Sequence, residues 1–349
     1  MPKTVFVGMS GGVDSSTSAL LLKEQGCRVV GVYMKNWSKD LPGMKCPWAE
    51  DLADAKRVAV KLGIDFEVWD FEDAYREKVV DYMLAEFKKG NTPNPDIMCN
   101  QEIKFKLFYE KAMEAGADFI ATGHYARVKQ SSLLRAADEN KDQTYFLYRI
   151  PEEALAHTIF PIGEIVKPEV KKMAEKHGLH NAYKKESMGV CFVGEVGMRD
   201  FLKEYIDVQP GEIREVETEK TLGYHEGAVF YTIGQRHGLY LNGEKGAVND
   251  GLPYYVVKKD LKNNVVYVSK NLNDKNLWTN ELKLKDIFLR REMGASQPVL
   301  ARLRHRAPLI PAKFDGKKLI FENEIKRPAP GQSAVIYDGE VCLGGGIIE

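Results

Sequence analysis

The sequence has few cysteines, no excess of charge of either sign and no long apolar run, and each absence excludes a class of protein. Five cysteines in 349 residues, with no C-x-x-C pair, are too few and too scattered for a secreted disulfide framework or a zinc site of that spacing. Lys and Arg total 50, as do Asp and Glu, so nucleic acid or an anionic membrane would have to be met by a local patch. No stretch approaches the ~18 apolar residues of a membrane span, and no apolar signal region opens the chain. We therefore expect a cytoplasmic protein with no membrane partner.

The length favours two or three domains, because a single core rarely grows beyond about 300 residues. As far as about residue 200, short β-rich runs alternate with longer helical patterns. This alternation predicts an α/β fold with a parallel sheet covered on both faces, whose ligands bind at the carboxyl ends of the strands. Beyond that point, alternating runs separated by Gly, Pro, Asn and Asp predict antiparallel β-structure. We expect domains at residues 1–202, 203–271 and 272–349.

The stretch GMSGGVDSS, residues 8–16, lies between a predicted strand and a predicted helix, where backbone N–H groups and the helix dipole can bind a phosphate. It lacks the Lys-Ser/Thr of a Walker A loop and the G-x-G-x-x-G spacing of a dinucleotide fold. The pattern S-G-G-x-D-S instead resembles the pyrophosphate-binding loop of ATP pyrophosphatases. That resemblance implies that Ser10 and Ser15 donate hydroxyls to the phosphates and that Asp14 helps to hold Mg²⁺. The alternative is a glycine-rich turn with a serine helix cap.

Two loops carry a cysteine in a setting that suits thiol chemistry. NTPNPDIMCN lies between two predicted helices, is stiffened by prolines, and presents Asp96 and Cys99. KKESMGVCFVGE presents Cys191, and the upstream Lys184 and Lys185 would favour a thiolate. Taken singly, each cysteine is better explained as a buried structural residue than as a functional one, because free cysteine is among the most buried residue types.

Together with the glycine-rich loop, these segments resemble one family closely, the bacterial tRNA-specific 2-thiouridylases, which put sulfur on the wobble uridine of tRNA. The matching segments follow the family's order and are GMSGGVDSS, NPDIMCN, ATGHYARV, DENKDQTYFLY, GVCFVGE and YTIGQRHGL. ARLRHRAP and PGQSAVIYDG mark the C-terminal part more thinly. In KKESMG, Glu186 and Met188 depart from the family's usual pattern and affect the electrostatics around Cys191. The resemblance implies a Rossmann-like ATP-pyrophosphatase domain, a small central β domain and a C-terminal β-barrel that contacts tRNA.

The resemblance also implies a mechanism. ATP would adenylate the uracil C2 oxygen, because a carbonyl oxygen is a poor leaving group and AMP is a good one. Cys191 would carry a persulfide supplied by a cysteine desulfurase or a sulfur-relay protein, Cys99 would be the partner thiol, and Asp96 would act as acid or base at the target uracil. The cycle would end in a Cys99–Cys191 disulfide that cellular thiols open. The implied substrates are the tRNAs for Lys, Glu and Gln.

The same resemblance assigns the remaining contacts. Those for ATP are Gly8, Met9, Ser10, Gly11, Gly12, Val13, Asp14, Ser15, Met34 and Gly123. Those for tRNA are Asn94, Pro95, Asp96, His124, Lys141, Asp142, Gln143, Arg304, His305 and Gln332. For His124 the alternative is a satisfied core or capping histidine, and for residues 140–143 a plain solvated loop.

Residues 301–318, ARLRHRAPLIPAKFDGKK, are basic in a chain whose net charge is zero. If the segment is a strand, alternation puts Arg302, Arg304 and Arg306 on one side, as a stripe suited to RNA phosphates. The alternative is a charged edge strand that guards against aggregation.

Two other functions stay open on the residues alone. A different ATP pyrophosphatase, such as an amide-forming synthetase that adenylates a carboxylate, would need no cysteine pair. A nucleotide-bound RNA-binding module with redox-sensing cysteines would bind without releasing pyrophosphate.

Overall fold

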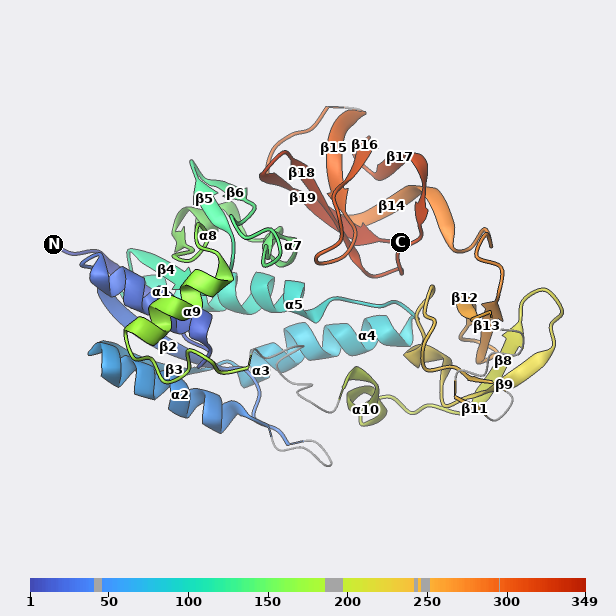
Figure 1. Ribbon diagram of the computed structural model, residues 1–349, viewed down its shortest axis with the longest axis horizontal. Helices are drawn as coiled ribbons and strands as arrows, with labels where there is room; N and C mark the ends of the chain where they lie inside the picture. Colours follow the sequence, from blue (N-terminus) through green and yellow to red (C-terminus); the bar gives the residue numbers. More distant parts are fainter. Residues whose placement is uncertain (41–45, 186–196, 242–243, 246–251, 295) are drawn as a thin grey trace.

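The computed structural model describes residues 1–40, 46–185, 197–241, 244–245, 252–294 and 296–349. Within these ranges the strands form a five-stranded, a six-stranded and an eight-stranded sheet. Figure 1 shows the five-stranded sheet near the N-terminus, and two long helical segments run from it toward the other two sheets.

The N-terminal sheet is parallel and has the order β3-β2-β1-β4-β7. Its strands are β1 (Thr4–Gly8), β2 (Arg28–Lys35), β3 (Asp65–Asp70), β4 (Phe119–Thr122) and β7 (Thr158–Ile159). Successive side chains of a strand point to opposite faces, so Val5 and Val7 pack on one side and Phe6 on the other. The face of Val5 and Val7 is covered by α1 (Val13–Glu24), α2 (Trp48–Leu62) and α9 (Lys167–Lys176). The face of Phe6 is covered by the helical segment that ends at Glu114, so both faces are covered and the predicted α/β fold is confirmed.

The two long helical segments each contain a wider, π-helical stretch. In the first, α3 (Glu72–Tyr75) continues through Arg76–Asp81 into α4 (Tyr82–Lys88). In the second, α5 (Pro95–Met98) continues through Cys99–Leu107 into α6 (Phe108–Glu114). π-Helical turns often occur at functional sites, and the second stretch begins at the predicted catalytic cysteine. The remaining helices are α7 (Thr144–Leu147), α8 (Glu152–Ala156), α10 (Met198–Lys203) and a 3₁₀ turn, Ala228–Phe230.

The central sheet has the order β11-β10-β9-β8-β13-β12. Its strands are β8 (Gly211–Glu215), β9 (Thr221–His225), β10 (Tyr240–Leu241), β11 (Glu244–Lys245), β12 (Tyr255–Asp260) and β13 (Val265–Ser269). Its neighbouring strands are antiparallel except for β13 and β8, which are parallel. This sheet is the predicted small central β domain.

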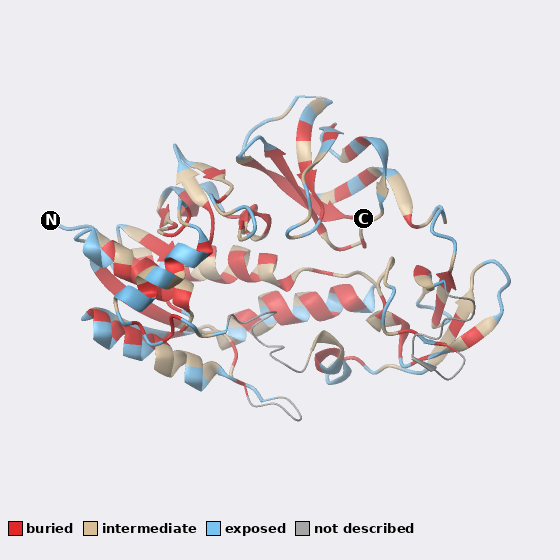
Figure 2. Ribbon diagram, in the orientation of Figure 1, coloured by how far each residue is buried: buried red, intermediate tan, exposed pale blue. Residues whose placement is uncertain are grey.

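The C-terminal strands form an antiparallel barrel, closed where β14 pairs with β19. The barrel strands are β14 (Trp278–Leu289), β15 (Gln297–Arg302), β16 (Ile310–Phe314), β17 (Lys318–Lys326), β18 (Ser333–Asp338) and β19 (Val341–Ile348). In Figure 2, β16 and β17 carry buried residues between exposed ones, as the wall of a filled barrel requires, whereas β18 and β19 are buried along almost their whole length. The barrel therefore confirms the third part of the predicted fold.

One feature of the barrel sheet was not predicted. The hairpin of β5 (Arg127–Lys129) and β6 (Ser132–Leu134) follows β4 in the chain, yet β6 pairs with β19 through Leu134 and Val341. Sheet pairing therefore joins the N-terminal part of the chain to the barrel. Among the helices that the structure describes, none is both long enough and apolar enough to cross a membrane.

Candidate active site

The glycine-rich loop lies where the strand order of the parallel sheet reverses. From β1 the chain proceeds to β2 on one side, whereas β4 lies on the other side, with Gly8 paired to Thr122. The crevice beyond the carboxyl ends of two such strands is where α/β sheets bind their ligands. The loop follows β1 and Gly123 follows β4, so the structure brings these predicted ATP contacts to one crevice.

Close backbone approaches hold the loop. A Cβ on Gly11, whose φ is +76°, would lie 2.4 Å from the carbonyl oxygen of Asp51, and a Cβ on Gly123 would lie 2.5 Å from the backbone N of Ser15. Only glycine fits at both positions. The backbone N–H of Ser10 donates to Oγ of Ser15 at 3.2 Å, which arranges both serines around the turn.

Three of the predicted ATP contacts differ in what they present to a ligand. The side chains of Met9 and Val13 are buried at 1% and 3% exposure, so these residues offer only backbone groups. Met34 is partly exposed, and its side chain packs over Gly8, where a Cβ would meet the Met34 methyl carbon at 2.9 Å. Met34 therefore forms an apolar surface beside the crevice.

Asp14 is engaged by residues that the sequence did not single out. Nζ of Lys167 donates to both carboxylate oxygens of Asp14 at 2.7 Å, and the hydroxyl of Tyr125 donates to one of them at 2.9 Å. Within the described ranges, no three His, Cys, Asp or Glu side chains cluster as a metal site requires. Asp14 is therefore the charge partner of Lys167 in this structure, and its predicted role beside Mg²⁺ stays a prediction, because Mg²⁺ bound with a nucleotide is held mainly by phosphates and needs only one or two carboxylates.

The segment after α9 is fastened to the same loop. The side-chain amide of Asn181 donates to the carbonyl oxygen of Gly11 and to Oγ of Ser16, each at 2.9 Å. Lys184 forms ion pairs with Asp51 and Asp54. Cys191, with its neighbours Glu186, Met188 and Gly189, lies outside the described residues.

The second predicted centre begins at the N-terminus of α5. The side chain of Asn94 accepts from the backbone N–H groups of Asp96 and Ile97, and Pro95 occupies the first turn. Asn94 is thus the helix cap that fixes Asp96. Cys99 follows within one turn and is 4% exposed. Burial raises the pKa of Asp96, and the nearby charge of Lys104 opposes that rise.

Lys104 connects this centre to the end of β4. Its Nζ lies 3.4 Å from Nε2 of His124, and Nδ1 of His124 lies 2.7 Å from the hydroxyl of Thr122. Burial, with a contribution from Lys104, places the pKa of His124 well below its usual range, so the ring is neutral at pH 7. Lys104 was not predicted from the sequence.

The remaining described cysteines with resolved pKa shifts are poor candidates for thiolate chemistry. Burial raises the pKa of Cys46, and it raises the pKa of the fully buried Cys342 to about 12. Both thiols stay protonated at neutral pH, which is typical of structural cysteines.

Of the predicted tRNA contacts at residues 141–143, Asp142 is buried and the other two are partly exposed. The carboxylate of Asp142 has no exposed surface and accepts from Arg302 at 2.5 Å. The side-chain oxygen of Gln143 accepts from the backbone N–H of Tyr125 at 2.9 Å. Lys141 is partly exposed. Asp142 therefore holds the barrel against the N-terminal domain and does not present its carboxylate to RNA.

The predicted strand over residues 302–306 is wrong. β15 ends at Arg302, which turns inward to Asp142, and Arg306 has a left-handed φ of +64°. Arg304 and Arg306 are exposed on the turn. The ring of His305 lies 4.5 Å from that of Phe146, and burial lowers the pKa of His305 to about 4. Two arginines, not three, are therefore available to a ligand.

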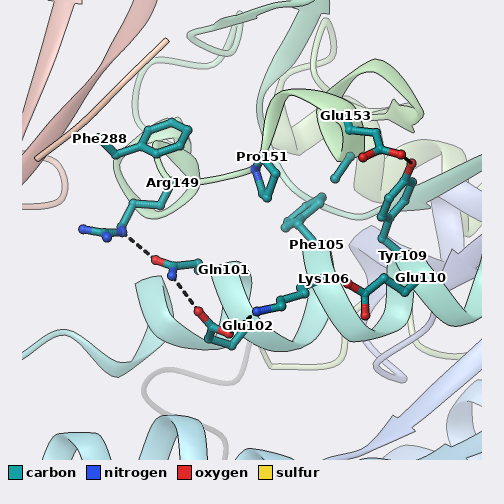
Figure 3. A pocket seen from close by; sticks show the side chains of 11 residues that line it. Gln101, Glu102, Phe105, Lys106, Tyr109, Glu110, Arg149, Pro151, Glu153 and Phe288 are labelled. Carbon is teal, nitrogen blue, oxygen red and sulfur yellow. Dashed lines mark hydrogen bonds and ion pairs between the residues drawn. The ribbon is translucent and has the colours of Figure 1, made fainter. Parts of the chain in front are cut away.

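A cavity of about 290 Å³ lies on another face of the second helical segment (Figure 3). Glu102, Phe105 and Tyr109 line its helical side, and Arg149 and Phe288 line the opposite side. None of the predicted site residues lines it. It is therefore distinct from the crevice described above.

Comparison with known proteins agrees with this organisation. Three family models match the chain, described as tRNA methyl transferase HUP domain over residues 3–195, tRNA methyl transferase PRC-barrel domain over residues 199–270, and aminomethyltransferase beta-barrel domain over residues 279–348. In solved structures, the chain is similar to a 4-thiouridine synthetase in complex with RNA and bound ATP, with a TM-score of 0.37 and 18% identity over 52% of this chain and 43% of that one.

Two curated relatives are similar over nearly their whole length. The tRNA-specific 2-thiouridylase MnmA of Pseudomonas fluorescens strain SBW25 is 47% identical over 357 residues, covering 99% of this chain and 95% of the relative. The protein of the same name from Stutzerimonas stutzeri strain A1501 is 48% identical over 355 residues, covering 99% and 94%. The resemblance seen in the sequence is therefore confirmed, and the chain belongs to the family of tRNA-specific 2-thiouridylases, which are enzymes.

Proposed function

We propose that the enzyme thiolates C2 of the wobble uridine of tRNA in two stages, adenylation of the C2 oxygen by ATP and sulfur transfer from a cysteine persulfide. One observation carries the proposal. The phosphate loop at the end of β1 and the Asp96–Cys99 segment are joined by a short chain of contacts, through Gly123 against Ser15 and Lys104 against His124. A nucleotide in the crevice and a base beside Asp96 would therefore be neighbours.

In the first stage the loop binds the phosphates of ATP. The loop lies at the N-terminus of α1 and carries the hydroxyls of Ser10 and Ser15, groups that suit a polyphosphate. Met34 and Gly123 border the space for the adenosine. Mg²⁺ would enter with the nucleotide as MgATP, held mainly by the phosphates, with Asp14 beside Lys167 as the carboxylate that helps to hold it. The C2 oxygen attacks the α-phosphate and pyrophosphate leaves.

Asp96 suits proton transfer at the target uracil. Its raised pKa keeps the carboxyl group protonated to higher pH than an exposed aspartate, so it can give a proton to the base or take one from it. Pro95 and the Asn94 cap fix its direction. The neutral His124 beside Lys104 provides a polar wall for the same space.

In the second stage Cys99 attacks the inner sulfur of a Cys191 persulfide. The S–S bond of the persulfide breaks, its outer sulfur leaves as hydrosulfide, and the Cys99–Cys191 disulfide forms. Hydrosulfide attacks the adenylated C2 carbon and displaces AMP, and two electrons from cellular thiols reopen the disulfide. A cysteine desulfurase or a sulfur-relay protein would load Cys191, and we place the reaction in the cytoplasm.

The tRNA would lie across the exposed basic groups of the barrel turn. Arg304 and Arg306 are exposed there, and Lys141 lies on the neighbouring loop that Arg306 contacts through the carbonyl of Asn140. Gln332 lies beside the catalytic segment, where its amide donates to the carbonyl oxygen of Thr92. The tRNAs for Lys, Glu and Gln are the proposed substrates.

The proposal is tested by incubating the protein with ATP, a persulfide donor and unmodified tRNA for these three amino acids. We expect 2-thiouridine at the wobble position by nucleoside mass spectrometry, with one AMP and one pyrophosphate for each thiolated base. Pyrophosphate release without tRNA, stimulated instead by an amine and a carboxylate, would identify an amide-forming synthetase. Binding of ATP and tRNA with no release of pyrophosphate would identify a redox-sensing RNA-binding module.

A further inference from the structure

The loop Gly90–Thr92, called here the junction loop, joins the first long helical segment to the catalytic segment that begins at Asn94. The central domain contacts it at two points. Nζ of Lys259 on β12 donates to the carbonyl oxygen of Gly90 at 2.7 Å, and the hydroxyl of Thr232 lies 3.3 Å from that of Thr92. The central domain therefore holds both ends of the junction loop.

The barrel holds the same loop from another side. The backbone N–H of Thr92 donates to the carbonyl oxygen of Pro330 at 2.7 Å, and the amide of Gln332 donates to the carbonyl oxygen of Thr92 at 2.6 Å. Both backbone polar groups of Thr92 are thus bonded to the barrel, while its hydroxyl meets the central domain. The three domains therefore meet at Thr92.

Two glycines allow the domains to approach the loop this closely. Gly90 has a φ of +83°, and a Cβ there would lie 2.6 Å from a methyl carbon of Leu261 in the central domain. Gly331 has a φ of +89°, and a Cβ there would lie 2.9 Å from the backbone N of Thr92. A larger residue at Gly331 would meet the backbone of Thr92 and push the barrel away from the loop, whereas one at Gly90 would have to displace the side chain of Leu261.

The chain between Thr92 and Asp96 is stiff. Pro93 and Pro95 are buried, and each fixes its own φ and restricts the residue before it. Asn94 between them bonds to the backbone of Asp96. A shift of Thr92 is therefore passed to Asp96 and Cys99 and is not absorbed on the way.

We propose that the junction loop makes sulfur transfer depend on the central domain and the barrel, with Thr92, Thr232 and Lys259 as positioning residues for Asp96 and Cys99. The inference rests on the proposed function, because that function assigns chemistry on the uridine to Asp96 and Cys99. It adds residues that contact neither ATP nor the reacting atoms. Their effect is on the rate of the reaction and not on the binding of its substrates.

A double-mutant cycle tests this with the full-length enzyme. Thr92→Val and Thr232→Val each remove one hydroxyl with little change of shape, and each should lower the single-turnover rate of thiolation about fivefold, the effect of one hydrogen bond. Because both remove the same contact, the double variant should be no slower than either single variant. The dissociation constants for tRNA and ATP should stay within about twofold of the wild-type values.

A neighbouring pair of lysines supplies the matched control. Lys259→Met should also lower the rate, whereas Lys258→Met should not, because Lys258 is exposed on the same strand and its Nζ lies over the ring of Tyr267. Wild-type rates in Thr92→Val and Thr232→Val would overturn the inference. The inference would also be overturned if the rate losses of the two single variants added up in the double variant, or if tRNA affinity fell as much as the rate, which would make Thr232 an RNA contact.

If the wild-type enzyme forms no 2-thiouridine, the proposed function fails, and this inference fails with it. If wild type thiolates and the variants match it, this inference alone fails.

Discussion

Nζ of Lys104 and Nε2 of His124 lie 3.4 Å apart, at the point where the second long helical segment meets the end of β4. The ammonium of Lys104 and burial of the ring both disfavour an imidazolium, and burial is the larger effect. With Nδ1 bonded to the hydroxyl of Thr122, the ring is held neutral and fixed in orientation. His124 is therefore a polar surface of the site and not a source of positive charge for RNA.

This arrangement predicts a defined loss of stability in acid. The pKa of His124 is lower in the folded than in the unfolded chain, so the unfolded chain takes up a proton first as pH falls below about 6.5. Each pH unit below that value should cost about 1.4 kcal/mol of unfolding free energy for as long as the folded ring stays neutral. Urea unfolding at pH 7.5 and pH 5.5 should show a smaller acid loss for His124→Gln than for wild type.

His237, which is exposed on the central domain, provides the matched control. His237→Gln should keep the wild-type dependence of stability on pH. An equal acid loss in His124→Gln and wild type would show that His124 titrates normally in the folded protein.

Variants of Asp14 distinguish its contribution to stability from its contribution to pyrophosphate release. Asp14→Ala leaves the ammonium of Lys167, whose side chain is 8% exposed, without its carboxylate, which should cost about 3 kcal/mol of stability. Asp14→Ala/Lys167→Met removes both charges and should regain most of that loss. Neither variant should release pyrophosphate from ATP in the presence of tRNA, because each lacks the carboxylate proposed to help hold Mg²⁺ on the phosphates. Normal turnover by Asp14→Ala would mean that the loop has been assigned wrongly.

The sequence predicted those parts of the fold and site that depend on local pattern. The β-α alternation, the glycine-rich loop and the Pro-Asp-x-x-Cys segment are each contained in short stretches, and the fold places the loop and the segment around one crevice. Lys104 and Lys167 could not be found in this way, because a lone lysine in a helix has no distinguishing pattern. Lys167 matters only because folding brings it to Asp14, which lies far away in the sequence.

The errors have a similar cause. Alternation of arginines is the pattern of an exposed strand face, but the buried carboxylate of Asp142 draws Arg302 inward and the chain turns after it. Asp142 itself lies in a polar stretch that is typical of a solvated loop, but its own loop and the docked barrel bury it, with donors from Ala136, Thr144 and Arg302. The pairing of β6 with β19 likewise depends on that docking and leaves no local signal.

The basic turn should bind RNA through two arginines. Arg304→Ala/Arg306→Ala should weaken tRNA binding and lower the slope of log Kd against log salt by up to about two. The slope falls because fewer phosphate contacts form, so tRNA binding releases fewer counterions. Affinity for ATP should not change. Arg302→Met should instead destabilise the fold by about 3 kcal/mol, since it removes the nearest charge partner of the buried Asp142 and leaves only the more distant Arg135. Unchanged tRNA affinity of the Arg304→Ala/Arg306→Ala variant across a salt series would leave the turn as a solvated surface.

Replacement of Cys191 and replacement of Cys99 should block different steps of sulfur transfer. Cys191→Ser should never become persulfidated, whereas Cys99→Ser should accept sulfur and yet fail to thiolate tRNA, because a hydroxyl can neither hold sulfane sulfur nor attack a persulfide. Mass spectrometry of intact protein and of tRNA nucleosides reads both outcomes. After one turnover without reductant, non-reducing digests should contain a Cys99–Cys191 linked peptide, which requires the two Cα atoms to come within about 7 Å. Full thiolation by Cys99→Ser would exclude the two-thiol mechanism.

The most direct measurement follows the oxygen atom that sulfur replaces. A tRNA carrying ¹⁸O at C2 of the wobble uridine is thiolated with ATP and a persulfide donor, and the AMP product is analysed by mass spectrometry. Adenylation of the C2 oxygen predicts one ¹⁸O atom in the phosphate of AMP for each 2-thiouridine formed. AMP without ¹⁸O, accompanied by thiolated tRNA, would contradict activation of the uridine by ATP and with it the proposed use of the crevice.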